Sequence, residues 1–234
     1  MKAVWAGEST TKVTVAEVTK TQPEWGHGIR ACFEIVSASR KNPHDVLGVE
    51  ADFADTAYLG YDPSGVLVSF FLVAWHRPSS VQPCIYLGLS GAREGFKGTK
   101  VTWPLYSALN SVACSWETLM ARQLLLWFIT PTMSAVIAAQ QVFASVRPGG
   151  VDDLAASEDD VPTLDALAAL FSSGTAVRST HLVIGATRSR YKQSKVDRQV
   201  AAAQRSGRSL AAAGLDQANG DRLLCLARPR HVEK

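Results

Sequence analysis

The sequence has 234 residues, of which 47% are hydrophobic and 19% charged, and its formal net charge is +3. This composition supplies a sizeable core and excludes wholesale disorder, and the charge is too small to indicate nucleic-acid binding by itself. The four cysteines and five histidines are scattered, without the short paired spacings of a zinc site, so we expect free thiols and no metal. The first residues lack an apolar signal region, and the longest apolar run, from Val66 to Trp75, is too short to span a bilayer. We therefore expect a cytoplasmic protein that makes no membrane contact.

The first part of the chain predicts strands separated by one amphipathic helix. β-Branched residues favour a strand from Lys12 to Val18, and apolar residues at three- and four-residue spacing predict a helix from Glu24 to Ala38. Two more strands are expected at Thr56–Gly60 and Val66–His76, joined by the turn Asp-Pro-Ser-Gly. The second of these strands is almost continuously apolar, which predicts burial on both faces.

The middle of the chain has the order strand, loop, helix, strand, helix. A strand is expected at Gln82–Leu89, followed by a loop rich in glycine and charge from Ser90 to Thr99 and by a helix from Val101 to Trp116. The segment Leu124–Thr130 predicts a buried strand, and helical periodicity returns from Ser134 to Val146. This alternation predicts a mixed α/β fold.

The last third of the chain is divided by charge. An acidic connection is expected at about 149–175, with a short helix near Pro162, then a strand at His181–Ala186, a basic helical segment at about 188–213 and a final strand at Asp221–Ala227. The basic run is either a solvated helix face or a docking surface for an acidic carrier protein, an acidic acceptor or RNA. Its near lack of aromatic residues argues against nucleic acid, and pairing with the acidic run within or between subunits would allow a homodimer.

The loop from Ser90 to Thr99 is the candidate anion site. A helix that begins after a glycine-bearing loop presents free N–H groups and the positive end of its dipole, which suits a pyrophosphate. The loop fails the P-loop pattern, because Phe96 stands where a second glycine is required after Gly91, and it lacks the Rossmann glycine pattern. It partly matches the pattern Arg/Gln-x-x-Gly-x-Gly/Ala, with Arg93 first, Gly98 sixth and Gly95 one place before the fourth position.

That pattern and the elements around it resemble the GNAT superfamily of N-acetyltransferases. The resemblance covers about Lys12 to Pro148, from the first strand and a split helix through the hairpin and the strand, loop and helix to the strand LLLWFIT and the helix after it. It implies a GNAT-like α/β fold with a mixed, splayed central sheet flanked by helices, and a single acyltransferase domain over residues 1–234. It also implies acyl-CoA, either acetyl-CoA or a longer ester, as the co-substrate, without a metal.

The resemblance further implies where the acyl donor binds. The pantetheine arm would lie between the strands Tyr86–Leu89 and Phe128–Thr130, and the pyrophosphate would lie on backbone N–H groups of the loop. The residues implied to bind the donor are Leu87, Gly88, Leu89, Arg93, Glu94, Gly95, Phe96, Lys97, Gly98, Thr99, Thr130 and Thr132.

Candidate catalytic groups follow from the chemistry of acyl transfer to an amine, which needs a base for the amine and an acid for the leaving thiolate. Relatives often carry Glu on the strand equivalent to Gln82–Leu89, Asn near Thr132 and Tyr near Val136, and this sequence has none of the three. We expect His76 as the base, because an imidazole titrates near neutral pH, and Tyr86 and Ser134 as groups that polarise or protonate the thiolate. Each has an ordinary structural alternative, as a strand-end histidine, a packing residue or a helix cap.

The sequence therefore predicts an acyltransferase that moves an acyl group from acyl-CoA to an amine of a small molecule or peptide by direct attack. One alternative is a non-catalytic GNAT-like module that binds acyl-CoA or a protein partner, which the missing Asn, Tyr and Glu favour. The other is an acyltransferase that takes its acyl group from an acyl carrier protein docked on the basic segment.

Overall fold

A computed structural model of the chain describes residues 12–76, 82–96, 99–150, 152–170, 175–176, 180–186, 191–192, 197, 215–216 and 220–231. The chain forms two compact units. The first comprises Met1–Trp75, Ile85–Arg122 and Arg230–Lys234, and the second comprises His76–Cys84 and Gln123–Pro229. Within the described ranges, no helix has the length and apolar character needed to cross a membrane.

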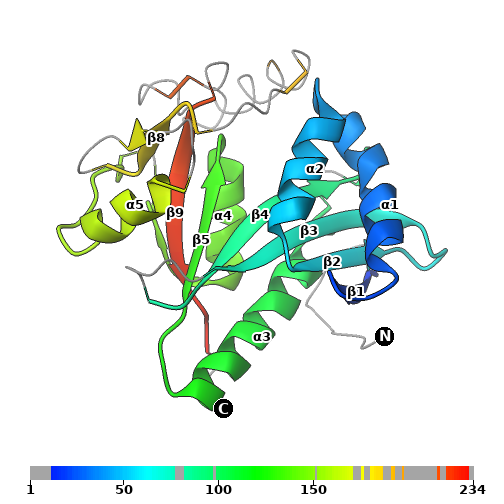
Figure 1. The fold of residues 1–234 in the computed structure, drawn as a ribbon, viewed down its shortest axis with the longest axis horizontal. Helices are drawn as coiled ribbons and strands as arrows, with labels where there is room; N and C mark the ends of the chain where they lie inside the picture. The colour runs from blue at the N-terminus through cyan, green and yellow to red at the C-terminus, as the bar shows by residue number, and fades with distance from the viewer. Residues whose placement is uncertain are drawn as a thin grey trace. The chain divides into compact units, whose positions relative to one another are not determined.

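Among its described residues, the first unit contains three helices and the strand order β1-β2-β3-β4 (Figure 1). Strands β1 and β2 pair antiparallel, with Glu17 opposite Tyr58, and β2 pairs antiparallel with β3, with Tyr58 opposite Phe71. In chain order the elements are β1 (Thr14–Thr19), α1 (Trp25–Ser37), α2 (Pro43–Phe53), β2 (Thr56–Tyr61), β3 (Leu67–His76), β4 (Cys84–Ala92) and α3 (Trp103–Met120).

Helices cover both faces of these strands. Apolar residues of α1 and α2, among them Ile35 and Leu47, form one core cluster with Leu59 and Leu72 of β2 and β3, and Figure 1 shows both helices in front of the strands. On the opposite face, the ring centre of Phe71 lies 4.7 Å from the ring centre of Tyr106 in α3. Because side chains alternate along a strand, β3 is buried on both faces, as its apolar run predicted.

The hairpin between β2 and β3 is held by the carboxylate of Asp62. Its Oδ1 accepts hydrogen bonds from the Ser64 N–H at 2.9 Å, the Ser64 hydroxyl at 2.7 Å and the Val66 N–H at 2.9 Å. Gly65 takes the left-handed conformation, with φ of 81°, that the turn requires. The turn predicted from Asp-Pro-Ser-Gly is therefore confirmed.

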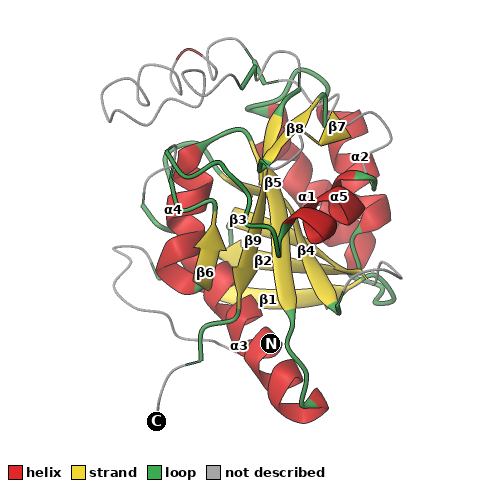
Figure 2. Cartoon of the chain, turned by 90° about the vertical axis from the view of Figure 1, so that its left-hand side faces the viewer, coloured by secondary structure: helices red, strands yellow, loops and turns green. Residues whose placement is uncertain are grey.

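The second unit has strands in the order β5-β9-β8-β7, with β6 also paired to β9 (Figure 2). All of its described pairings are antiparallel, and Phe128 at the centre of β5 lies opposite Cys225 of β9. Its elements are β5 (Leu125–Thr130), α4 (Met133–Val142), β6 (Ala144–Arg147), α5 (Val161–Ala168), β7 (Thr175–Ala176), β8 (Leu182–Ile184) and β9 (Arg222–Arg228).

The mixed α/β class predicted from the sequence is confirmed, with two local differences. A helix that the sequence did not predict, α2, follows α1, and Pro43 occupies its first position, where the missing N–H is tolerated. The helix predicted to continue to Val146 ends at Val142, because Phe143 is extended and the chain enters β6. Most of the basic segment predicted at about 188–213 lies outside the described residues.

Candidate active site

The segment from β4 to α3 contains most of the predicted donor-binding residues. β4 continues to Ala92, so Ser90 and Gly91 belong to the strand and not to the loop. A tight turn follows, in which the Phe96 N–H donates to the Arg93 carbonyl at 3.1 Å and Gly95 has a φ of 87°. The hydroxyl of Thr99 then donates to the Phe96 carbonyl at 2.6 Å. Lys97 and Gly98 lie outside the described residues.

Arg93 ties this turn to the rest of the first unit. Its Nε donates to the Leu67 carbonyl at 2.9 Å, and its Nη2 forms an ion pair of 2.8 Å with Glu34 of α1. The Arg93 backbone N–H also donates to the Val68 carbonyl at 2.8 Å. The guanidinium expected to meet a phosphate is thus engaged with β3 and α1.

A cation that sequence reasoning missed lies at the start of α3. Exposed Lys100 has a φ of 62°, and its Nζ lies 4.3 Å from the centre of the Trp103 ring at the first position of the helix. Thr102, the N-cap residue, makes no side-chain capping bond. The positive end of the helix dipole and the ammonium group together form an electrostatic setting suited to an anion.

The centre of β4 receives a carboxylate from α2. Oε2 of Glu50 accepts a hydrogen bond from the Leu89 N–H at 3.1 Å. Gly88 leaves room for it, since a Cβ there would lie 2.8 Å from the same oxygen. The buried side chain of Tyr86 shares this face and meets Phe53 edge-on, with ring centres 5.5 Å apart.

The environment of Glu50 changes its proton affinity. Burial raises the pKa of the Glu50 carboxyl to about 6, although the Leu89 N–H, the charge of Arg40 and a hydrogen bond from Tyr86 act to lower it. Burial disfavours the charged form, whereas hydrogen bonds and the nearby cation favour it. Sequence reasoning missed Glu50, and the available signal was an acidic residue between the apolar positions Leu47 and Ala51 of one helix.

The remaining predicted residues fall in the second unit. Thr130 ends β5, and its hydroxyl bonds to the backbone of Thr132, accepting from the N–H and donating to the carbonyl, both at 3.2 Å. Thr132 is the N-cap residue of α4. His76 ends β3 and Ser134 lies in α4, but their side chains are outside the described part of the structure.

An open cleft of about 1180 Å³ lies beside the edge strand β1. His27 of α1 lines it together with Glu17, Tyr58 and Ser111, and none of its described lining residues is Lys or Arg. Burial and the negative charge of Glu17 raise the pKa of the Tyr58 hydroxyl. The cleft therefore presents an acidic surface on the side of β1.

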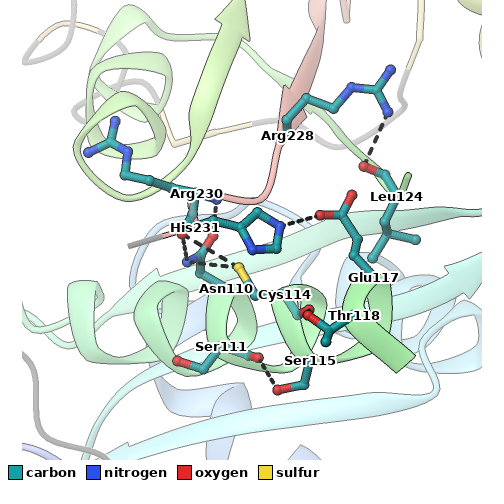
Figure 3. Close-up of polar contacts among 10 residues, drawn as sticks. All are labelled: Asn110, Ser111, Cys114, Ser115, Glu117, Thr118, Leu124, Arg228, Arg230 and His231. Atoms are coloured by element: carbon teal, nitrogen blue, oxygen red, sulfur yellow. Dashed lines mark hydrogen bonds and ion pairs between the residues drawn. The ribbon is translucent and has the colours of Figure 1, made fainter. Parts of the chain in front are cut away.

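The thiols of Cys84 and Cys114 are not activated as nucleophiles. Burial raises the pKa of the Cys84 thiol to about 11 and also raises that of Cys114. Figure 3 shows Cys114 in a contact between α3 and the chain end, where its Sγ and the Asn110 amide both meet the Arg230 carbonyl. Since the thiolate is the nucleophilic form, these cysteines are structural. The described residues contain no group of three or more metal-ligating side chains.

No family model matches the sequence. No curated protein matches it either. Solved structures do resemble it. An IAA acetyltransferase from Bacillus cereus ATCC 14579 is 8% identical with a TM-score of 0.40, over 93% of this chain and 99% of that one. A GNAT family N-acetyltransferase from Escherichia coli in complex with CoA is 10% identical with a TM-score of 0.37, over 53% and 66% of the two chains. The NatC complex bound to Gag peptide and CoA gives 9% identity and a TM-score of 0.39, over 56% and 82%.

Proposed function

We propose that this protein transfers an acyl group from acyl-CoA to an amine of a small molecule or peptide. The observation that carries the proposal is the order of the first unit, in which β1, two helices and three strands lead through a tight turn into α3. This is the strand, turn and helix arrangement in which a helix start can hold a pyrophosphate. The donor's arm would lie along Leu87–Leu89, and its pyrophosphate would meet the start of α3.

Residues of this chain have defined roles in that proposal. Lys100 and the dipole of α3 attract the pyrophosphate, while Arg93 holds the turn in shape through Glu34 and the Leu67 carbonyl. Backbone groups of β4 orient the thioester, so that the amine attacks a fixed carbonyl carbon. The C–N bond forms, the C–S bond breaks, and the thiolate leaves as CoA.

The first prediction concerns donor binding. Lys100→Glu places a negative charge where the pyrophosphate would lie, so we expect acetyl-CoA to bind at least about tenfold more weakly, a loss of about 1.4 kcal/mol. Isothermal titration calorimetry with CoA and with acetyl-CoA measures it. Lys41→Glu is the matched control, because Lys41 is exposed between α1 and α2, and it should leave binding unchanged.

Turnover is tested next with a panel of primary amines and peptides with free N-termini, by following release of the CoA thiol. A wild-type protein that binds neither CoA nor acetyl-CoA would overturn the proposal. So would a protein that binds acetyl-CoA and acylates no member of the panel.

A non-catalytic acyl-CoA-binding module is the second candidate. It is favoured by Arg93, whose guanidinium is already bonded to Glu34 and to the Leu67 carbonyl. It is also favoured by Thr132 and Val136, which stand near positions where relatives often carry Asn and Tyr. Binding of acetyl-CoA without turnover is the result that this candidate predicts. Transfer from an acyl carrier protein would instead require the basic segment, and strong weakening by salt would indicate it.

A further inference from the structure

Strand β4 carries no acidic side chain, yet a carboxylate lies on it. The sequence of β4 is CIYLGLSGA, and the carboxylate belongs to Glu50 of α2, 39 residues before its partner Leu89. Buried Val46 and Leu47 on the same helix pack into the core of the first unit. This packing fixes α2 so that Glu50 points at the backbone of β4.

The strand is shaped to receive this side chain. At Gly88, a Cβ would lie 2.8 Å from the Glu50 Oε2 and 3.1 Å from the Leu72 carbonyl oxygen, so no other residue fits without displacing the carboxylate. Glu50 is partly exposed as a residue, while its carboxyl is held against the strand by the Leu89 N–H. The groups that interact with it are the Leu89 N–H, the Tyr86 hydroxyl and the charge of Arg40.

The proton affinity of this carboxyl suits a base that works near neutral pH. With a pKa of about 6 it is ionised at pH 7.5, but it holds a proton more tightly than an ordinary glutamate. General-base efficiency is highest when the pKa of the base approaches the working pH. The position of the Glu50 carboxylate and its proton affinity therefore both suit a general base.

We propose that Glu50, supplied by helix α2, is the general base for the acceptor amine, which rests on the proposed acyl-transfer function. The acceptor's ammonium group gives one proton to the Glu50 carboxylate, and the neutral nitrogen attacks the thioester carbon. As the C–N bond forms and the C–S bond breaks, the second proton of the nitrogen passes to the leaving thiolate. Glu50 then releases its proton to solvent, which leaves an amide and CoA.

The test compares wild type with Glu50→Gln, in which the amide oxygen still accepts from the Leu89 N–H but cannot take up a proton. For an alkylamine from the panel, we expect kcat/KM of wild type to rise with pH through an apparent pKa of about 6. In Glu50→Gln that limb should disappear and the rate should fall about 10²- to 10⁴-fold. Acetyl-CoA binding should be unchanged.

Two further measurements distinguish a general-base role of Glu50 from a purely structural role. Transfer to hydroxylamine, a weakly basic acceptor that is neutral at working pH, should survive Glu50→Gln far better than transfer to the alkylamine. Glu50→Asp, which keeps a carboxyl, should recover part of the lost rate and the pH limb. Asp45→Asn on the first turn of the same helix is the control and should behave as wild type.

The results of these experiments distinguish a failure of the proposed base from a failure of the proposed acyl-transfer function. Wild type that binds no acetyl-CoA, or acylates no amine, overturns the acyltransferase and the base with it. An active wild type whose rate and pH profile persist in Glu50→Gln overturns the base alone. Equal losses with alkylamine and hydroxylamine, without recovery in Glu50→Asp, would also overturn it, because that pattern belongs to a structural role.

Discussion

Gly88 is the residue on which the position of Glu50 depends. A Cβ added there would lie 2.8 Å from the Glu50 Oε2, and the backbone carbonyl of Leu72 at 3.1 Å cannot move aside easily. Only a glycine therefore leaves the carboxylate on the Leu89 N–H.

We predict that Gly88→Ala lowers the free energy of unfolding by about 1–3 kcal/mol through overpacking. It should also reduce acyl transfer, because the displaced carboxylate no longer lies at β4. Chemical denaturation and the amine assay measure the two effects. Gly48→Ala, on the exposed side of α2 with nothing within 4 Å, is the control and should gain up to about 1 kcal/mol from helix propensity. Equal stability of the two variants would contradict the prediction.

Glu50 also makes stability depend on pH. Its pKa of about 6 in the folded protein lies above the ordinary 4.5, so the folded state binds the proton more tightly than the unfolded state. The contribution is fully present below about pH 4.5 and is lost as the pH rises to about 6. Above that range the loss is constant, at roughly 1–2 kcal/mol after allowance for partial exposure.

Glu50→Gln should accordingly gain stability relative to wild type as the pH rises from 4.5 to 6, and keep that gain at higher pH. Thermal unfolding of both proteins across this range is the measurement. Asp45→Asn again serves as the control. A difference between Glu50→Gln and wild type that stays flat across the range would contradict the assignment.

At the scale of elements, α3 anchors the end of the described chain. Asn110 accepts from the Arg230 N–H at 2.8 Å and donates to the Arg230 carbonyl at 3.0 Å, and Glu117 pairs with His231 at 2.6 Å (Figure 3). One amide side chain thus satisfies both polar groups of one backbone residue.

We predict that Asn110→Ala costs about 1 kcal/mol of stability, because two partly exposed hydrogen bonds are lost. The sharper readout is hydrogen exchange at the Arg230 amide, which should become at least about tenfold faster. Ser107→Ala, one turn earlier on the same helix, is the control. Unchanged exchange at Arg230 would show that Asn110 does not hold the chain end.

Elements with strong local patterns were predictable, and those set by distant contacts were not. The Asp-Pro-Ser-Gly turn, β3 and α3 follow from turn chemistry and periodicity within a few residues. α2 was missed because Pro43 can either end one helix or begin another. β6 was missed because its four residues depend on pairing with β9, more than seventy residues later.

For the whole molecule, the sequence proposed a candidate site but not Glu50, the base proposed here. The resemblance drew attention to β4 and the turn after it, and the structure describes Leu87–Leu89 and Arg93–Phe96 there. Glu50 could not be found that way, because its meeting with Leu89 depends on the packing of α2. Lys100 was not among the predicted donor-binding residues, and the predicted helix start, Val101, lies two residues before the observed one at Trp103.

The pairing of β5 with β9 has a consequence for synthesis on the ribosome. More than ninety residues separate Thr130 at the end of β5 from Arg222 at the start of β9. β5 is made first, and the edge of its Leu-Leu-Trp-Phe-Ile core that pairs with β9 stays unpaired until the last strand emerges. Non-local pairing of this kind is slow, and an exposed apolar strand is prone to aggregate. The nascent protein is therefore most dependent on chaperones between the translation of these two strands.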